Sequence, residues 1–256
     1  MKAKTICIAN QKGGVGKTTT AVNLGTSVAL SKRKTLLIDI DPQGNAGSGV
    51  GVKPDGKATI YHAIVLEKRI DSIIQKTEIP NLYFVASDID LTGAEIELVN
   101  MEQREYRLIR SLEQIKTDFD FIFIDCPPSL GLLTINSLVA ADSVLIPLQC
   151  EYYALEGLSK LLNTIKLVKG KLNPDLTIEG ILLTMFDKRN NLSHQVAEEI
   201  MQHFPKKVFK VIIPRNVRLA ECPSYGKPVF FYDRQSVGSK SYIELAQQIL
   251  SDERNQ

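Results

Sequence analysis

The sequence predicts an α/β fold in which a doubly wound, mostly parallel sheet carries helices on both faces. Short apolar runs alternate along the chain with longer stretches of helical periodicity, which is typical of strands that are buried on both sides and joined by helices. A glycine-rich segment follows the first apolar run and leads directly into the first helical stretch. The 256 residues show no repeat and no break in composition, so we expect a single domain over residues 1–256.

The individual elements follow from these patterns. The apolar runs predict seven strands, at Thr5–Ala9, Thr35–Ile38, Leu82–Ala86, Phe121–Ile124, Ser143–Ile146, Ile178–Met185 and Val208–Ile213. The helical periodicity predicts helices at Thr18–Leu30, Gln103–Lys116, Leu132–Ala140, Leu155–Lys169, Leu192–His203 and Ser241–Leu250, the last followed by a polar tail, Ser251–Gln256. Gly44–Gly56 contains five glycines and a proline, and we expect it to form a loop over the site.

Composition and charge exclude several classes of protein. Lys and Arg number 31 against 29 Asp and Glu, so nucleic-acid binding would need local clustering of cations. No segment approaches the roughly 20 apolar residues of a membrane span, and no signal peptide is present, so we expect a cytoplasmic protein. The first strand begins by residue 5, which argues against an amino-terminal DNA-binding extension. The four cysteines are widely spaced, and we expect neither a disulfide nor a metal role for them.

Residues 12 to 19 read Lys-Gly-Gly-Val-Gly-Lys-Thr-Thr and predict a phosphate-binding loop. Glycines let main-chain N–H groups point inward around an anion, and the following helix adds its positive end. Lys17 is expected to reach the outer phosphates and Thr18 to ligate Mg²⁺. The usual pattern begins with glycine, whereas Gln11 stands here and is followed by a second lysine. The nucleotide-binding residues predicted in this loop are Lys12, Gly13, Gly14, Val15, Gly16, Lys17, Thr18 and Thr19.

Carboxylates follow two of the predicted strands. Asp125 ends an apolar strand, and ligands in open α/β sheets sit at the carboxyl ends of strands, so we expect it to hold Mg²⁺ opposite Thr18. Asp39 and Asp41 close the second strand and face the same way. We assign Asp41 to orienting the attacking water in phosphoryl transfer and treat Asp39 as a supporting candidate.

The motifs together resemble those of the ParA family of chromosome- and plasmid-partitioning ATPases. Residues 12–19, 39–45 and 125–129 are similar to its deviant Walker A, switch I and switch II/Walker B motifs. The resemblance runs through nearly the whole chain. Two later stretches, Gln149–Gly157 and Ile213–Leu219, resemble the chromosomal, Soj-like branch most closely.

The resemblance implies a P-loop ATPase that uses ATP and Mg²⁺, with weak basal hydrolysis. It implies that Lys12 is the signature lysine that reaches the partner's phosphates in an ATP-bound homodimer. It also implies that Asp41 promotes hydrolysis, so that the catalytic set comprises Lys12, Lys17 and Asp41. Pro214 and Asn216 fall where relatives contact or flank the adenine.

Basic residues cluster late in the chain. Between positions 201 and 240 there are eight basic residues and only two acidic ones, which favours a phosphate-binding face. The resemblance implies that Arg189 and Arg218 carry non-specific binding of double-stranded DNA. No base-reading signature is present, so contact with backbone phosphates is expected.

The resemblance implies an ATP-driven partitioning switch on the nucleoid, released when a ParB-like centromere-binding protein stimulates hydrolysis. Regulation of a replication initiator is an open variant that the sequence does not separate from partitioning. A MinD-like membrane-associated ATPase would need a basic amphipathic carboxyl-terminal helix, and Ser241–Leu250 has too few cations for it. A nitrogenase-iron-protein-like redox role lacks a second suitably placed cysteine. An ATP-dependent ligase would be recognised by turnover without DNA or protein stimulation.

Overall fold

The computed structural model describes residues 2–52, 56 and 58–254. Seven strands form one sheet in the order β3-β4-β2-β5-β1-β6-β7. All neighbours pair in parallel except β3 and β4, which are antiparallel. The strands are β1 (Lys4–Ile8), β2 (Thr35–Asp39), β3 (Gln75–Lys76), β4 (Leu82–Val85), β5 (Phe121–Asp125), β6 (Ser143–Gln149) and β7 (Thr177–Thr184). The predicted fold class is confirmed.

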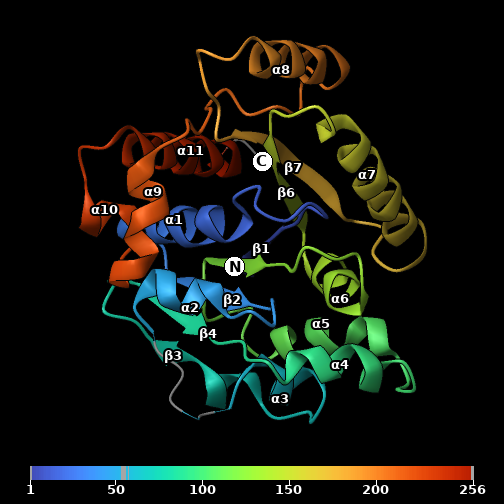
Figure 1. Cartoon of the computed structure of the whole chain (residues 1–256). Coiled ribbons are helices and arrows are strands. Elements are labelled where there is room, and N and C mark those ends of the chain that lie inside the picture. Colours follow the sequence, from blue (N-terminus) through green and yellow to red (C-terminus); the bar gives the residue numbers. More distant parts are fainter. Residues whose placement is uncertain (1, 53–55, 57, 255–256) are drawn as a thin grey trace.

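Helices cover both faces of this sheet (Figure 1). The α-helices are α1 (Lys17–Leu30), α2 (Asn45–Val50), α3 (Ile60–Ile64), α4 (Leu91–Leu98), α5 (Arg107–Glu113), α6 (Leu132–Ala140), α7 (Ala154–Lys171), α8 (Asn191–His203), α9 (Val217–Glu221), α10 (Val229–Tyr232) and α11 (Val237–Arg254). Three 3-10 turns, η1 (Ile70–Ile73), η2 (Arg104–Tyr106) and η3 (Cys222–Tyr225), lie between them.

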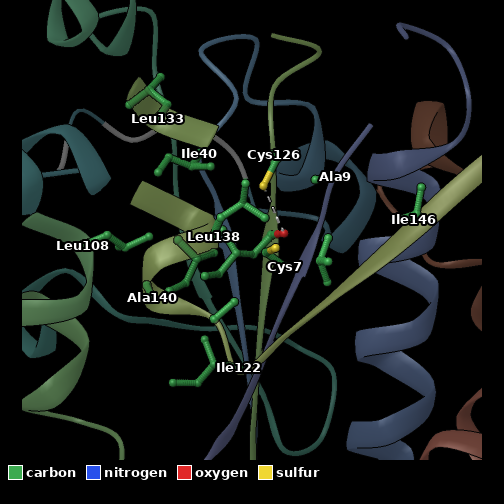
Figure 2. Packing of buried hydrophobic residues seen from close by; sticks show 14 of the residues in the cluster. Cys7, Ala9, Ile40, Leu108, Ile122, Cys126, Leu133, Leu138, Ala140 and Ile146 are labelled. Carbon is green, nitrogen blue, oxygen red and sulfur yellow. Dashed lines mark hydrogen bonds between the residues drawn. The ribbon is translucent and has the colours of Figure 1, made fainter. Parts of the chain in front are cut away.

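Successive residues of a strand point to opposite faces of the sheet and so belong alternately to two separate hydrophobic cores. Ile122 and Ile124 of β5 pack with α3 to α8, whereas Phe121 and Phe123 pack with α1, α2 and α9 to α11. Figure 2 shows part of the first core, to which Ile122 of β5 and Leu138 of α6 both belong. Burial on both faces explains why these strands read as continuous apolar runs in the sequence.

The seventh predicted strand, Val208–Ile213, is wrong. The segment runs along β7 but bonds to it only at intervals: Phe209 N–H donates to the Ile181 carbonyl at 3.0 Å and Ile213 N–H to the Leu183 carbonyl at 2.9 Å. The segment therefore advances by four residues while β7 advances by two, and the chain between these bonds bulges away from the edge. Among the described residues, this segment forms isolated β-bridges, at Val208 and Pro214, in place of a continuous β-ladder.

The expected loop at Gly44–Gly56 is also wrong in part, because α2 occupies its first half. The Asp39 carboxylate accepts the Ala46 N–H at 2.9 Å and so holds the first turn of this helix. Gly49 is needed for close packing, since a Cβ there would lie 2.8 Å from Val22. Residues 53–55 and 57 of the predicted loop lie outside the described residues.

Two predicted helices have different bounds in the structure. The helix predicted at Gln103–Lys116 is shorter, because Gln103 has a left-handed φ of 51° and a 3-10 turn precedes α5. The last helix extends beyond Ser241–Leu250 at both ends and takes in part of the expected polar tail. Among the described residues, no helix is both long enough and apolar enough to cross a membrane.

Candidate nucleotide-binding site

The site lies where the carboxyl ends of the central strands meet. Pairing of β5 with β1 places Asp125 opposite Ile8, and pairing with β2 places it opposite Asp39. The glycine-rich loop leaves β1 at the same edge and enters α1 at Lys17. Parallel pairing thus brings together three segments that are far apart in the sequence, as expected for a ligand site in an open α/β sheet.

The loop between β1 and α1 has an open, glycine-dependent conformation. Gly14 and Gly16 have φ values of 73° and 87°, which side chains with a Cβ rarely adopt. A Cβ added at Gly13 or Gly14 would meet nothing within 4 Å, so free space adjoins the loop there. No side chain caps the first turn of α1. The loop and helix end therefore offer main-chain N–H groups to an anion.

Lys17 extends back over this loop. Its ammonium donates to the Lys12 carbonyl at 3.2 Å, and the residue is buried. Burial lowers the pKa of Lys17, while the negative charges of Asp125 and Asp41 oppose that shift. The main-chain N–H groups of the loop from Gly13 to Thr19 form an open candidate anion-binding site, termed the cradle. A buried cation beside this cradle is well suited to binding a phosphate group.

Lys12 points to a different partner. Its ammonium forms an ion pair with the Glu151 carboxylate, which follows β6. The other Glu151 oxygen accepts a hydrogen bond from the Gln149 amide. The Lys12 main-chain N–H donates to Asn10 Oδ1 at 3.0 Å, and the Asn10 amide donates to the Pro147 carbonyl at 2.7 Å. The Lys12 ammonium is thus held beside the end of β6.

Asp125 is fully buried, and neither of its carboxylate oxygens has a hydrogen-bond partner among the described residues. Burial raises its pKa to about 7; nearby Thr18 and Lys17 oppose the rise, and Asp41 adds to it. Unpartnered buried carboxylate oxygens call for a cation or a proton. A carboxylate next to a threonine hydroxyl fits the oxygen ligands that Mg²⁺ prefers.

No group of three or more His, Cys, Asp or Glu side chains arranged for a metal occurs in the part of the chain that the structure describes. A cation held by Asp125 and Thr18 would therefore complete its shell with other oxygens, such as those of a phosphate or water.

The carboxylates after β2 have structural contacts of their own. Asp39 is fully buried, and its two oxygens accept the N–H groups of Asp41 and Ala46 at 3.0 and 2.9 Å. Burial and the neighbouring Asp125 raise the pKa of Asp39 well above its usual range. Asp41 is nearly buried; one carboxylate oxygen accepts the Gln43 N–H at 3.0 Å, and the Ser87 hydroxyl donates to its carbonyl. Asp39 organises the turn, and Asp41 is buried beside it.

A mostly apolar cavity of about 280 Å³ adjoins the loop. Its lining includes Gly16 and Thr19 from the loop end, and the predicted residues Pro214 and Asn216. The Asn216 side chain also caps α9, accepting the Leu219 N–H at 3.3 Å. The size and lining suit a planar, largely apolar ring attached to a phosphate chain.

Met185 and Tyr242 are among the further cavity residues that sequence reasoning missed. Met185 has a left-handed φ of 47°, unusual for a side chain with a Cβ, and Tyr242 reaches the cavity from α11. The Tyr242 hydroxyl lies 3.1 Å from Thr20 Oγ1 of α1. No sequence signal near the loop points to a residue more than 200 positions away.

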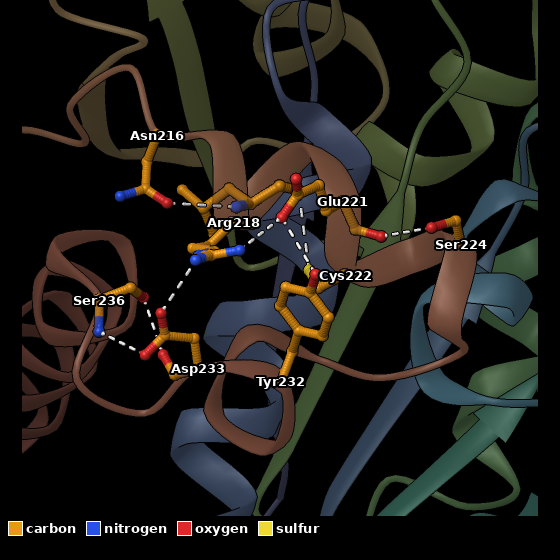
Figure 3. A network of polar contacts seen from close by, with 9 residues as sticks. Asn216, Arg218, Glu221, Cys222, Ser224, Tyr232, Asp233 and Ser236 are labelled. Carbon is orange, nitrogen blue, oxygen red and sulfur yellow. Dashed lines mark hydrogen bonds and ion pairs between the residues drawn. The ribbon is translucent and has the colours of Figure 1, made fainter.

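The structure does not bring the two predicted DNA-binding arginines together. Arg189 lies before α8, is 87% exposed and pairs with Asp187 at 3.0 Å. Arg218 lies on α9 and pairs with Glu221 at 3.0 Å and Asp233 at 3.3 Å, the two acidic residues of the basic region (Figure 3). Each guanidinium already has carboxylate partners within its own chain.

The fold and the glycine-rich loop together define a P-loop nucleotide-binding protein. Residues 3–178 match a family model described as an AAA domain. The chain is 60% identical to the chromosome partitioning protein ParA of Myxococcus xanthus over 248 residues, 96% of this chain and 88% of the relative. It is 56% identical to the sporulation initiation inhibitor protein Soj of Bacillus subtilis over 250 residues, 97% of this chain and 99% of the relative. The chain belongs to the ParA family, in its Soj-like chromosomal branch.

Solved structures share the fold. A cobyrinic acid a,c-diamide synthase from Mycobacterium smegmatis, crystallised with ADP and magnesium, superposes with a TM-score of 0.87 at 34% identity, covering 98% of this chain and 96% of that one. A plasmid partition protein from Borrelia burgdorferi bound to AMPPNP gives a TM-score of 0.83 at 29% identity, covering 98% and 100%.

Proposed function

We propose that residues 1–256 form a single ATPase domain that acts as a DNA-partitioning switch in the cytoplasm, on the nucleoid. The observation that carries this is the buried pair of Asp125 and Lys17 beside an open glycine loop. Asp125 has two oxygens without a described partner, and Lys17 is a buried cation that donates to a carbonyl of the loop. Both need a ligand with phosphate oxygens and a cation, as ATP with Mg²⁺ provides.

Each residue then has a role in binding and hydrolysis. The loop from Gly13 to Thr19 and Lys17 bind the phosphates, and Pro214 and Asn216 flank the adenine in the apolar cavity. Thr18 and Asp125 hold Mg²⁺, which neutralises phosphate charge when it is bound. Asp41 orients the attacking water through its carboxylate, of which one oxygen accepts the Gln43 N–H.

Lys12 couples nucleotide to assembly in this proposal. Released from Glu151, its ammonium reaches the phosphates bound by a second copy of the chain, so that the homodimer forms only with ATP. The dimer binds double-stranded DNA without sequence preference through Arg189, Arg218 and neighbouring cations. A ParB-like protein stimulates hydrolysis and so releases the DNA; control of a replication initiator would use the same cycle.

Binding of random-sequence DNA tests this function. Wild type and Asp41→Ala are compared without nucleotide, with ADP-Mg²⁺ and with ATP-Mg²⁺, at two salt concentrations. We expect binding that requires ATP, falls steeply with salt and lasts longer in Asp41→Ala, because slower hydrolysis prolongs the DNA-bound state. If ATP-dependent dimers form but bind no DNA, DNA is not the target, and lipid vesicles are tested next.

A ligase is a second candidate, because one similar structure is described as a synthase. A ligase would be recognised by ATP turnover that requires a small carboxylate substrate and is unaffected by DNA or by a protein partner. The higher identity to partitioning proteins favours the switch.

A further inference from the structure

An exposed apolar stripe runs along α4. Ile89, Ile96 and Val99 are 67%, 75% and 52% exposed, although their opposite face, formed by Leu91, Ala94 and Leu98, is buried. The turn before the helix continues its geometry, since the Thr92 N–H donates to the Ile89 carbonyl at 2.9 Å. Spacings of seven and three residues place the three side chains on one side of the helix.

Negative charge surrounds this stripe. Between positions 88 and 102 the chain has five acidic residues and no basic one, although the whole protein is slightly basic. These acidic residues are Asp88, Asp90, Glu95, Glu97 and Glu102. Arg104 lies next to the stripe, where it donates to the Val99 carbonyl at 2.7 Å, but its charge is paired with Glu105 at 2.9 Å. The Tyr61 hydroxyl donates to Glu97 at 3.1 Å, and loss of solvation, Glu97, Asp90 and Asp88 together raise the pKa of Tyr61. The stripe is therefore bordered by an excess of negative charge that suits a cationic partner.

A groove connects the stripe to the proposed hydrolysis residue. A cavity of about 370 Å³ is lined by Ile89 and Asp88 at one end and by Pro42, Gln43 and Gly44 at the other. The last three directly follow Asp41. Ser87, which also lines the cavity, donates its hydroxyl to the Asp41 carbonyl. Whatever fills this groove therefore contacts the loop that positions the Asp41 carboxylate.

The same helix also contacts the segment that follows Asp125. The Glu95 carboxylate lies against Gly131 at the start of α6, where an added Cβ would be 2.0 Å from Oε1, and this oxygen has no described partner. α4 packs against α3 and α6 (Figure 1). It thus lies near the loop that follows β2, which carries Asp41, and near the segment that follows Asp125 at the end of β5.

We infer that the α4 surface, defined by Ile89, Ile96, Val99 and the surrounding acidic residues, is the docking site for a basic peptide segment with apolar side chains. This rests on the proposed function: the segment belongs to the protein that stimulates hydrolysis. Apolar side chains of the segment pack on the stripe, its cations face the carboxylates, and its end enters the groove beside Asp41. DNA is a poor occupant, because the surface repels phosphate.

Charge reversal provides the test. Asp90→Lys combined with Glu102→Lys changes two exposed residues of the surface, and Glu113→Lys with Asp175→Lys reverses two exposed carboxylates elsewhere as the matched control. Ile96→Ser is paired with Leu167→Ser, since Leu167 on α7 is similarly exposed at 62%. ATP turnover is measured on random DNA with and without the ParB-like protein of the same organism, alongside ATP-dependent dimerisation and DNA binding.

We expect the increase in ATP turnover that the partner induces to be at least tenfold smaller in both surface variants than in wild type. Their unstimulated turnover, dimerisation and DNA binding should stay within twofold of wild type, and both controls should respond normally. A p-benzoylphenylalanine at position 96 should crosslink to the partner, and one at position 167 should not.

Three results would overturn the inference. Normal stimulation of both surface variants would show that the partner docks elsewhere. Loss of ATP-dependent dimers in the surface variants would make the surface a contact between two copies of this chain. If wild type itself is neither stimulated nor crosslinked although it dimerises and binds DNA, the proposed partner scheme fails, and the docking site with it.

Discussion

The Lys12 ammonium is paired with the Glu151 carboxylate of its own chain, 139 positions away. This ion pair engages the lysine that, in the proposed switch, would contact a second copy of the chain. Tyr152 and Tyr153, directly after Glu151, are 76% and 67% exposed and pack edge to face against each other. The ion pair and the exposed aromatic pair adjoin at one edge of the site, which makes this edge the expected place of subunit contact.

Replacing Glu151 should ease dimerisation. Glu151→Gln removes the charge that holds Lys12, so half-maximal dimer formation should need less ATP. Both side chains are more than a third exposed, and such pairs contribute at most about 1 kcal/mol, so the shift should not exceed about fivefold. Analytical ultracentrifugation across an ATP titration measures it. Glu156→Gln, which breaks the exposed pair with Lys160, is the control. A higher ATP requirement in Glu151→Gln would mean that Glu151 supports the dimer instead.

Replacing Lys17 and replacing Lys12 should each disrupt a different step, nucleotide binding or dimerisation. Lys17→Ala removes the buried cation of the cradle and should abolish nucleotide binding by the monomer. Lys12→Ala should leave monomer binding of ATP intact and block dimerisation, because its ammonium pairs with Glu151 and, in the proposed switch, acts on a second copy. Fluorescent ATP binding and sedimentation separate the two steps. Normal ATP-dependent dimers of Lys12→Ala would remove this residue from the subunit contact.

The arginines should govern DNA affinity without affecting the ATP site. Arg189→Ala combined with Arg218→Ala should weaken DNA binding, and the slope of log affinity against log salt should fall by about 0.9 for each phosphate that the variant no longer neutralises. DNA titrations at several salt concentrations measure this slope. ATP-dependent dimerisation should persist; its disappearance together with DNA binding would indicate misfolding.

Because Glu221 and Asp233 compete with phosphate for Arg218, Asp233→Asn should tighten DNA binding. DNA affinity at two salt concentrations measures this effect, and Asp175→Asn, at an exposed position outside the basic region, is the control. Unchanged affinity in Asp233→Asn would show that this carboxylate does not restrain Arg218.

Sequence could predict the sheet and the loop because both depend on local patterns. Buried strands read as apolar runs, and the carboxylates that follow β2 and β5 meet because parallel strands end at one edge. The errors have physical causes. Gly47 and Gly49 suggest a loop, yet they allow α2 to pack closely on its neighbours. The role of Asp39 depends on the N–H of Ala46, a hydrogen bond that exists only once α2 forms.

Contacts between residues far apart in the chain could not be predicted from the sequence either. Sequence identified Arg218 as a cation but not its partner Asp233, because that pairing needs α10 to fold back beside α9. Tyr242 enters the apolar cavity beside the glycine-rich loop only because α11 packs on α1. Such pairings depend on how distant elements meet in space, which periodicity does not encode.

The thiols should be unreactive in the folded protein. All four cysteines are buried, and burial raises the pKa of Cys150 and of Cys222 to about 11. Roughly one in a thousand of the Cys150 and Cys222 thiols would then be ionised at pH 8. We expect fewer than one thiol per chain to react with Ellman's reagent at that pH, and all four after denaturation. Rapid reaction of the native protein would contradict the packing of both cores.

The same shifts predict alkaline destabilisation. Folded Cys150 and Cys222 keep their protons at pH values where ordinary thiols, with a pKa of about 8.5, lose them. The free energy of unfolding should therefore be fully retained below about pH 8.5 and fall as the pH rises towards 11. Urea titrations of wild type and Cys150→Ala at several pH values check this. The variant should show a shallower decline, and an identical slope would exclude Cys150 as a contributor.

Close packing of the bulged segment on β7 should make Gly180 hard to replace. A Cβ there would lie 2.5 Å from the ring of Phe209, which is 4% exposed and has little room to move. Gly180→Ala should lower the free energy of unfolding by about 1–3 kcal/mol, the usual cost of overpacking a core. Gly170→Ala, in α7 with nothing within 4 Å, should instead raise it by about 0.5–1 kcal/mol. Urea unfolding measures both, and a neutral Gly180→Ala would mean that Phe209 does not fix the segment to the sheet edge.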